Sequence, residues 1–409
     1  MQLDLVIKNI SVLATAKGKS VQRGIEQGNI ETRENMAIGI LDKKIAYIGK
    51  EQEAPIGAKE IDAGGRLVTP GLVDAHTHLV FGGYRQNELE RKLRGDSYLD
   101  ILRSGGGILS TVNSTRAAGF EELQTKAESF LDKMLAHGTT TVEAKSGYGL
   151  DMETEIKQLQ VVKALNESHK MDIVSTFMGA HAIPNEYKDN PEGFVDFIIN
   201  EMIPHVAKEK LAKYCDIFCE TAVFDVSQSR RILTAAKEQG FKVKIHADEI
   251  DPIGGASLAG ELQCISAEHL IAAPDEGLDE LAKNGVIAVL LPATSHYLNK
   301  DYARAKEMIK RGIPIAVASD FNPGSSPNFN LQVAMSLSCL KYKLTPKEAL
   351  MAVTLNGACA IEMQETKGTI EIGKDADIVI WDCPDLNFLF YRFGNNQVHT
   401  VIKNGRIVL

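Results

Sequence analysis

Two patterns in this chain of 409 residues predict an α/β fold. Between residues 65 and 364, short apolar strands alternate with helical segments, and eight strand candidates follow one another in this way. Eight such units in about 250 residues are typical of a (β/α)8 TIM-type barrel. Residues 1–64 and 365–409 contain short strands and turns instead. We expect the two chain ends to meet in a small β-sandwich domain outside the barrel.

The eight barrel strands are predicted from short runs of β-branched and other apolar residues. They are residues 72–78, 139–146, 172–181, 216–220, 242–249, 264–270, 286–292 and 314–320. Helical patterns lie between most of them, such as FEELQTKAESFLDKMLAHG (120–138) and SQSRRILTAAKEQG (227–240). Each of these two patterns ends in a glycine, which is a common helix stop.

The chain ends have the pattern of strands joined by turns. The predicted strand segments are LVIKNISVL (5–13), AIGILDKKIAYIGK (37–50), ADIVIWD (376–382) and HTVIKNGRIVL (399–409). The sequences DKK, KDAD and KNGR contain Asp, Asn or Gly, which favour turns.

Composition and charge exclude several classes of protein. The net charge of −9 and the lack of a basic stripe argue against nonspecific binding of nucleic acid. No apolar run reaches the roughly 18 residues that a membrane span requires, and the amino terminus lacks the pattern of a signal peptide. The six cysteines lie mostly in apolar runs, which favours a reducing, cytoplasmic compartment. Cys215 and Cys219 would share a strand face and could bind metal, but two small buried hydrophobes are the favoured interpretation.

Histidines and one aspartate fall where the predicted strands end. His76 and His78 close the first strand, two residues apart, so their side chains point the same way. Active sites of this fold lie at the carboxyl ends of the strands. For any single histidine the alternative is a buried imidazole with satisfied hydrogen bonds. The further residues at this rim are His181 on strand three, His246 on strand five, His269 on strand six and Asp320 on strand eight.

The residue types at this rim suit a catalytic metal. Such a site needs about three protein ligands and an open position for water. His76, His78 and His246 supply nitrogens, and Asp320 supplies a carboxylate oxygen. This set suits zinc, with Fe(II) or Mn(II) also compatible. The metal would lower the pKa of water towards ~7, and Asp320 could both touch the metal and accept the proton of that water.

These residues resemble the amidohydrolase superfamily, which has HxH after strand one, histidines on strands five and six, and aspartate at strand eight. The segment KGTIEIGKDADIVIWD (367–382) looks like the superfamily's return into its small β domain. Dinuclear members usually carry a carboxylated lysine at the end of strand four. That strand ends here in residues 218–220, Phe-Cys-Glu, so the resemblance implies a mononuclear site. Lys145 becomes a candidate bridge only if the strand count is off by two.

Over nearly its whole length the chain is similar to imidazolonepropionases, the enzymes of histidine degradation. One local departure is LPATSHYL (291–298), where a more aromatic segment is expected, and it bears on the shape of the pocket wall. The motifs that carry the similarity are FGGYRQNE (81–88), KSGYGL (145–150), GAHAIP (179–184), HADE (246–249), AEHL (267–270) and SDFNPGSSP (319–327).

The resemblance implies hydrolytic ring opening of 4-imidazolone-5-propanoate to N-formimidoyl-L-glutamate, with one divalent or trivalent metal ion, Zn or Fe. It also implies a homodimer that acts on a small molecule. Asp320, His269 or Glu249 would serve as catalytic acid and base, and the sequence does not separate these assignments. The implied substrate contacts are Arg85, as a clamp for the propanoate carboxylate, with Tyr148, His181, Glu249, Asn322, Gly324 and Ser325.

Three other hypotheses remain open at this point. Another cyclic amidohydrolase or an aromatic deaminase would share the metal residues, but a neutral nucleobase has no carboxylate for Arg85 to bind. A metal-free barrel that only binds partners would be expected to lose ligands, and this chain keeps them. A binding protein for imidazolone compounds would show affinity without turnover.

Overall fold

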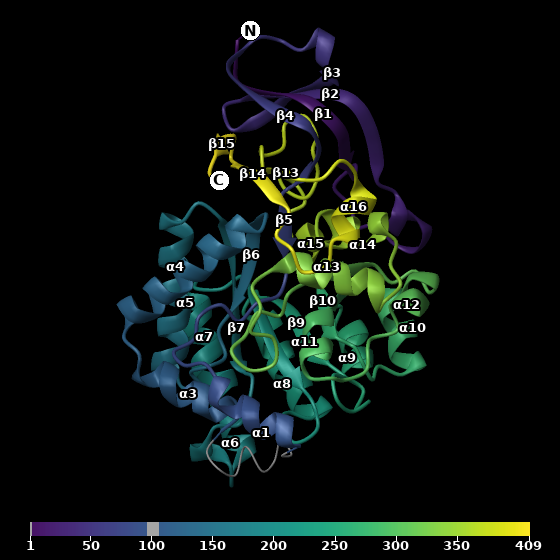
Figure 1. The fold of residues 1–409 in the computed structure, drawn as a ribbon. Helices are drawn as coiled ribbons and strands as arrows, with labels where there is room; N and C mark the ends of the chain where they lie inside the picture. Colours follow the sequence, from purple (N-terminus) through teal and green to yellow (C-terminus); the bar gives the residue numbers. More distant parts are fainter. Residues whose placement is uncertain (1, 96–105) are drawn as a thin grey trace.

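The computed structural model describes residues 2–95 and 106–409. Eight parallel strands form one sheet in the order β12-β11-β10-β9-β8-β7-β6-β5, with helices around it (Figure 1). This arrangement confirms the predicted barrel. Its strands are β5 (Leu72–Asp74), β6 (Thr139–Lys145), β7 (Asp172–Ala180), β8 (Tyr214–Cys219), β9 (Lys242–Ala247), β10 (Ser266–His269), β11 (Ile287–Leu290) and β12 (Ile315–Val317).

The barrel closes between the segments that follow its first and last strands. Thr77 and Phe321 form an isolated parallel bridge. The backbone N–H of His78 donates to the carbonyl of Phe321 over 2.8 Å, and the N–H of Asp320 donates to the carbonyl of His76 over 3.1 Å. These bonds bring the histidine pair directly beside the aspartate.

The same bonds correct the predicted bounds of the two closing strands. The sequence predicts strands over 72–78 and 314–320, but β5 ends at Asp74 and β12 at Val317. Beyond these ends the two segments bond to each other across the seam, although Thr77 still accepts from the N–H of Lys145 and Ala318 still donates to Leu290. The histidine pair therefore lies just after a strand rather than within one.

Helices connect the strands and cover the outside of the barrel (Figure 1). The predicted helical patterns are confirmed, because α4 lies within the first and α8, which begins one residue earlier at Val226, covers most of the second. The α-helices of the described chain are α1 (Leu89–Arg94), α3 (Ile108–Ala117), α4 (Phe120–Ala136), α5 (Met152–Ser168), α6 (Pro191–Phe197), α7 (Ile203–Lys208), α8 (Val226–Glu238), α9 (Gly255–Glu261), α10 (Asp275–Asn284), α11 (Pro292–Tyr297), α12 (Ala305–Lys310), α13 (Leu331–Leu340), α14 (Pro346–Ala352), α15 (Leu355–Ala360) and α16 (Leu386–Tyr391).

Both chain ends build a second sheet, as predicted. Its seven strands hydrogen-bond in the order β15-β14-β13-β4-β1-β2-β3. Two of its hairpins turn at Asp42-Lys43 and Asn404-Gly405, where both residues have positive φ, as type I′ turns require. The strands are β1 (Leu3–Thr15), β2 (Glu31–Leu41), β3 (Lys44–Lys50), β4 (Gly57–Pro70), β13 (Ile378–Trp381), β14 (Val398–Lys403) and β15 (Arg406–Ile407).

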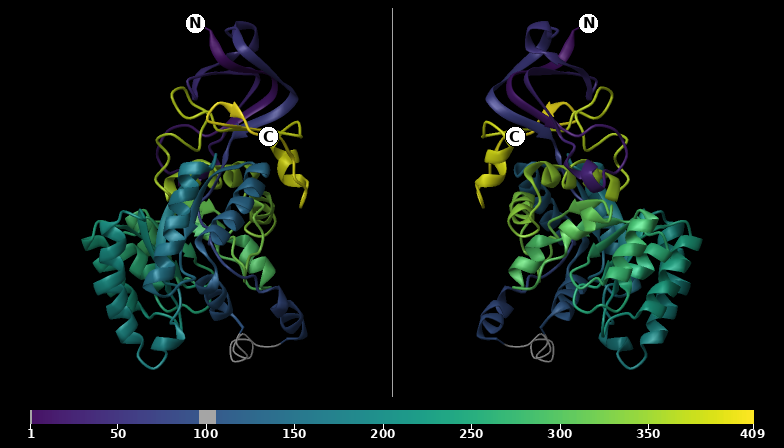
Figure 2. Two further views of the ribbon diagram at one scale, coloured as in Figure 1. Left: turned by 90° about the vertical axis from the view of Figure 1, so that its left-hand side faces the viewer. Right: turned by 90° about the vertical axis from the view of Figure 1, so that its right-hand side faces the viewer.

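The terminal sheet lies at the amino-terminal end of the barrel strands. Asp172, the first residue of β7, pairs with Lys367 at 2.6 Å and also with Lys403 of β14. Both lysines are buried, and each also pairs with Asp377. Figures 1 and 2 show this sheet and both termini on one side of the barrel. The carboxyl ends of the strands, where the polar residues lie, face away from it.

Candidate metal centre and active site

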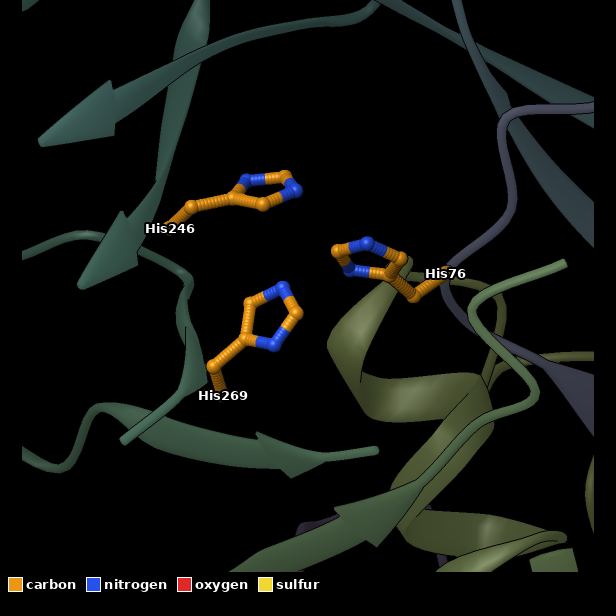
Figure 3. Close-up of side chains that lie close together, drawn as sticks. All are labelled: His76, His246 and His269. Carbon is orange, nitrogen blue, oxygen red and sulfur yellow. The ribbon is translucent and has the colours of Figure 1, made fainter. Parts of the chain in front are cut away.

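Four imidazole rings converge at the carboxyl end of the barrel strands. The ring of His76 lies 5.3 Å from that of His78 and 4.6 Å from that of His246, measured between centroids. The rings of His246 and His269 are 5.2 Å apart. Figure 3 shows His76, His246 and His269 pointing into one space from three different segments. All four side chains are buried.

Asp320 completes this cluster from the segment after β12. Its Oδ1 lies 3.3 Å from Nε2 of His76 and 3.6 Å from Nε2 of His78. Its Oδ2 accepts a hydrogen bond from the hydroxyl of Thr294 in α11. Burial raises the pKa of Asp320 to about 6, although the hydrogen bond from Thr294 and the nearby His246 lower it. One carboxylate oxygen is thus fixed by a hydroxyl while the other faces the imidazoles.

The backbone at this cluster adopts a conformation that is rare for residues with side chains. Asp320 has φ +52° and His269 has φ +68°. Such strained residues concentrate at functional sites, where the surrounding structure holds them. Both therefore mark this rim as a site rather than an ordinary strand end.

The donor atoms fit a metal ion. His76, His246 and His269 form one group whose potential ligand atoms lie within 4.8 Å of one another, and His76, His78 and Asp320 form another. Within the described residues, Nε2 of His76 and of His246 has no hydrogen-bond partner. Buried polar atoms normally have a hydrogen-bond partner, so two neighbouring imidazole nitrogens without one indicate a binding site for a ligand.

Burial also favours the neutral form of His76, His78 and His269, which is the form that binds a metal. Burial lowers the pKa of His76 well below its usual range, and the charge of Lys145 lowers it further. Burial likewise lowers the pKa of His78, with His181 nearby, and that of His269, with His246 nearby. Neutral imidazole nitrogens are metal ligands, whereas imidazolium is not.

Two buried carboxylates orient the metal-facing histidines. Oε2 of Glu268 in β10 lies 2.6 Å from Nδ1 of His76, and Oδ1 of Asp216 in β8 lies 3.2 Å from Nδ1 of His246. A carboxylate beside Nδ1 keeps the proton on that nitrogen and leaves Nε2 with its lone pair. Both histidines therefore present Nε2 to the shared space.

A layer of buried charge lies beneath these carboxylates. Nζ of Lys145 is 2.7 Å from Glu143 and 2.8 Å from Asp216. Lys244 lies 3.5 Å from Glu143 and 3.9 Å from Glu268. Burial lowers the pKa of Lys145, but the negative charges of Asp216 and Glu143 raise it by a larger amount. The net result is a pKa above the usual range of lysine.

Lys145 is thus a cation held by two carboxylates. It lies on the second barrel strand, β6, while the fourth strand, β8, ends at Cys219. The strand count made from the sequence is correct, and no shift by two strands brings Lys145 to the position of a bridging lysine. That the site holds one metal ion stays a prediction.

Arg85 lies beside the loop that follows Asp320. A Cβ atom placed on Gly324 would fall 1.1 Å from Nη2 of Arg85, so the guanidinium rests directly against the glycine backbone. Asn322 binds this loop together, since its Oδ1 accepts from the backbone N–H of Gly324 over 2.8 Å and of Ser325 over 2.7 Å. The structure therefore brings all four predicted residues into one wall of the site.

Tyr148 and His181 lie next to the metal-facing imidazoles. The rings of His78 and His181 stack at 4.8 Å, and Tyr148 lies 5.3 Å from His181 and 5.8 Å from His78. Nδ1 of His181 lies 3.0 Å from the carbonyl oxygen of Gly147, to which it donates when neutral. Burial lowers the pKa of His181 to about 3, with a further contribution from His246.

Glu249 follows β9 and faces His269. Its Oε2 lies 3.6 Å from Nε2 of His269. Burial raises the pKa of Glu249 to about 8, and the charges of Asp320 and Glu220 add to this effect. The carboxyl group is therefore largely protonated near neutral pH in the metal-free protein and can donate a hydrogen bond.

Comparison with known proteins agrees with this geometry. The amidohydrolase family matches residues 67–408. The chain is 51% identical to the imidazolonepropionase of Alkaliphilus metalliredigens over 100% of this chain and 99% of that protein. It is 56% identical to the imidazolonepropionase of Treponema denticola over 86% of this chain and 85% of that protein. The chain belongs to the amidohydrolase family, among the imidazolonepropionases.

Solved structures share the fold of this amidohydrolase at low sequence identity. A triazine hydrolase variant has a TM-score of 0.77 at 17% identity, covering 99% of this chain and 94% of its own. An adenosine deaminase from Xanthomonas campestris with bound zinc has a TM-score of 0.71 at 18% identity, covering 100% and 93%. E. coli guanine deaminase has a TM-score of 0.72 at 14% identity, covering 100% and 99%. These similarities support the barrel with its terminal sheet.

Two sequence expectations concern features away from this amidohydrolase centre. Cys215 and Cys219 are buried free thiols, burial raises the pKa of each, and neither belongs to the metal-compatible groups of the described residues. No helix in the described ranges has the length and apolar character needed to cross a membrane.

Sequence reasoning missed several residues of this amidohydrolase site. Thr294 lies in LPATSHYL, the one segment that departs from the family pattern, and its hydroxyl contacts Asp320. The other missed residues were marked in the sequence by charge inside apolar strand segments, which burial in a barrel permits only with partners. They are Glu143, Asp216, Lys244 and Glu268.

Proposed function

We propose that the chain is an imidazolonepropionase that hydrolyses 4-imidazolone-5-propanoate to N-formimidoyl-L-glutamate in histidine degradation. The observation that carries this proposal is 51% identity to imidazolonepropionases along the whole chain. The geometry is consistent with it, because an arginine and a histidine cluster lie at one barrel mouth. A substrate with an anionic tail and a planar polar ring suits such a pair of subsites.

The substrate is proposed to bind along the wall formed after β12. Arg85 offers two parallel N–H donors for the propanoate carboxylate, a geometry that lysine cannot provide. The loop of Asn322, Gly324 and Ser325 supports the guanidinium and supplies polar groups beside it. Tyr148 and His181 contact the ring from the opposite side, and the hydroxyl of Glu249 can donate to it.

The metal ligands are proposed to be His76, His78, His246 and Asp320, and the ion is zinc or iron. Three imidazoles and one carboxylate suit either metal. A metal bound there supplies Lewis acidity, which polarises a carbonyl oxygen and lowers the pKa of water. The bare Nε2 atoms of two of these histidines support the assignment.

The catalytic protons are proposed to move through Asp320, His269 and Glu249. Asp320 accepts the proton of the attacking water, because its Oδ1 faces the imidazole nitrogens while Oδ2 is held by a threonine. Water adds to the ring carbonyl carbon, and the bond from this carbon to the ring nitrogen breaks. His269, 3.6 Å from Glu249, hydrogen-bonds the carbonyl oxygen, and the proton that Asp320 took from the water is passed to the leaving nitrogen, directly or through His269.

The test of the function is hydrolysis of freshly prepared 4-imidazolone-5-propanoate, followed by loss of its ultraviolet absorbance. Wild type loaded with zinc or iron is expected to turn over this substrate. Arg85→Ala is expected to lower kcat/KM by about 10- to 100-fold with the metal retained, since a charged bidentate contact is lost. Arg94→Ala is the matched control, because Arg94 is exposed on α1.

Two outcomes would change this assignment. If metal-loaded wild type gives no turnover, the substrate is wrong, and aminated heterocycles and other cyclic amides are tested next. If Arg85→Ala is as active as Arg94→Ala, the enzyme assignment stands but the carboxylate clamp is wrong.

We further propose a homodimer in the cytoplasm, with domains formed by residues 1–64 plus 365–409 and by residues 65–364. Free thiols at all six cysteines support a reducing compartment. Sedimentation of the purified protein tests the dimer. The separate terminal sheet supports a division into two domains, and limited proteolysis tests where the bounds lie.

A further inference from the structure

A single buried carboxylate binds three of the four backbone amides of residues 147–150, in the loop after β6. Oε1 of Glu155 in α5 accepts from the N–H of Gly149 over 2.7 Å and of Leu150 over 2.9 Å. Its Oε2 accepts from the N–H of Gly147 over 3.0 Å. The side chain of Glu155 has no exposed surface. One side chain thus fixes three peptide units of the loop that carries Tyr148.

The neighbouring turn of α5 binds the remaining amide of this loop. Oε1 of Gln158 accepts from the N–H of Tyr148 over 3.2 Å. Its Nε2 donates to the carbonyl of Val80 over 2.7 Å. Val80 lies in the segment that runs from His78 to Arg85. Gln158, also fully buried, therefore ties the tyrosine loop to the arginine loop.

The carboxylate also acts on His181 through a single residue, Gly147. The N–H of Gly147 donates to Glu155, and the carbonyl of Gly147 receives Nδ1–H of His181 at 3.0 Å. Gly147 has φ +109°, and a Cβ there would lie 2.8 Å from Nδ1 of His181. Leu150, at the other end of the loop, has φ +55°, which costs energy in a residue with a side chain. The loop thus holds a strained shape that needs outside support.

These contacts exceed what α5 itself requires. The helix already has a cap, since the side chain of Asp151 accepts from the N–H of Thr154 over 2.7 Å. In the described part of the chain, no lysine or arginine forms an ion pair with Glu155. Burying a carboxylate without a cation is costly unless several donors reach it. The donors that reach this one belong to the loop.

We propose that Glu155 and Gln158 are positioning residues for substrate binding, which hold Tyr148 and His181 in place against the substrate ring. This role rests on the proposed function, because it concerns the same site. The two side chains touch the backbone behind the site and not the substrate space. Their loss is therefore expected to weaken binding while the metal ligands remain undisturbed.

The first test compares Glu155→Gln and Gln158→Met with wild type. Glu155→Gln keeps Oε1 as an acceptor for Gly149 and Leu150 but replaces Oε2, the closer of the two acceptors for Gly147, by an NH2 group. Gln158→Met keeps the side-chain length but leaves the amide of Tyr148 without its acceptor. Each is expected to raise KM about tenfold, because a buried loop amide that loses its acceptor no longer holds the loop in its binding shape. The metal content and kcat are expected to change by less than about threefold.

Matched controls come from exposed positions on the same helix. Glu153→Gln and Gln160→Met make the same chemical changes at residues that face solvent. Both are expected to keep the KM of wild type. Hydrogen exchange at residues 147–150 is measured alongside, and it is expected to be faster in the two buried variants than in the controls.

A double-mutant cycle separates positioning from a general loss of structure. In a His181→Ala background, Glu155→Gln is expected to raise KM by no more than about twofold, since its effect passes through His181. The same tenfold rise in that background would overturn the proposal. So would an unchanged KM in folded Glu155→Gln and Gln158→Met. If wild type itself gives no turnover, the proposed function is overturned, and the positioning role stated for it falls too.

Discussion

The carboxylate of Glu268 sets which nitrogen of His76 faces the metal, and replacing it by glutamine should reverse that choice. Its Oε2 lies 2.6 Å from Nδ1 of His76, while Oε1 accepts from the hydroxyl of Ser266 and lies 3.9 Å from Nζ of Lys244. The hydroxyl of Ser266 and the ammonium group of Lys244 both favour an oxygen at the Oε1 position. In Glu268→Gln the NH2 group therefore points at Nδ1.

This reversal has a definite chemical consequence. An NH2 group beside Nδ1 requires that nitrogen to accept, so the imidazole proton moves to Nε2, the atom that faces the other ligands. That proton must leave Nε2 of His76 before the nitrogen can bind a metal ion. Loss of such an orienting partner typically weakens metal binding by about 10- to 100-fold, or about 1.4 to 2.7 kcal/mol. We expect Glu268→Gln to fall within this range.

The assay is competition for zinc between the protein and a chromophoric chelator, near neutral pH. Glu276→Gln is the matched control, because Glu276 is an exposed residue of α10. Thermal unfolding of both metal-free proteins confirms that they are folded. A zinc affinity for folded Glu268→Gln within about twofold of wild type would refute the reasoning, since it would show that this hydrogen bond does not set the tautomer.

Three further predictions concern the same rim. Gly324→Ala is expected to displace the guanidinium of Arg85, because the new Cβ would lie 1.1 Å from Nη2. Steady-state kinetics should then show a KM about tenfold higher than that of wild type, and an unchanged KM would contradict the contact. Thr294→Val is expected to weaken zinc binding several-fold, because Oδ2 of Asp320 loses its hydrogen bond. Thr294→Ser retains the hydroxyl and is expected to keep the zinc affinity of wild type. Equal zinc affinities of the two variants would contradict this role of Thr294. The raised pKa of Glu249, about 8, means that its contribution to stability is complete below its unfolded value and is lost as the pH rises towards about 8. Metal-free Glu249→Gln should therefore gain roughly 2 to 4 kcal/mol over wild type between about pH 5 and pH 9 in chemical denaturation, and a constant difference would contradict the shift.

Local sequence patterns predicted the elements of this barrel but not its seam. The alternation of apolar strands with helical patterns is a short-range signal, and all eight strands lie where it placed them. The stretch of residues 75–78 has equally good strand character. Its backbone also bonds to residues 320 and 321, more than two hundred positions away, and no local pattern contains that information.

The candidate site also has a part that the sequence could predict and a part that it could not. Its histidines and Asp320 could be found because strand ends in a barrel gather at one rim, which converts positions along the chain into proximity. The supporting residues could not be assigned, because each acts through a partner on another strand. Glu268 is the clearest case: it stands directly before His269 in sequence, yet it orients His76 on the far side of the seam.

The charged layer inside the barrel links the fold to the metal centre. Glu143, Lys145, Asp216, Lys244 and Glu268 all have no exposed surface, and they come from four different strands. A buried charge without a partner is strongly unfavourable, so these residues become compatible with folding only when the strands have assembled. Two of the carboxylates, Glu268 and Asp216, also hydrogen-bond the histidines above them through one oxygen each. The hydrogen bonds that satisfy the barrel interior are thus the same ones that orient the imidazoles, and closing the barrel assembles a site whose donor atoms fit a metal ion.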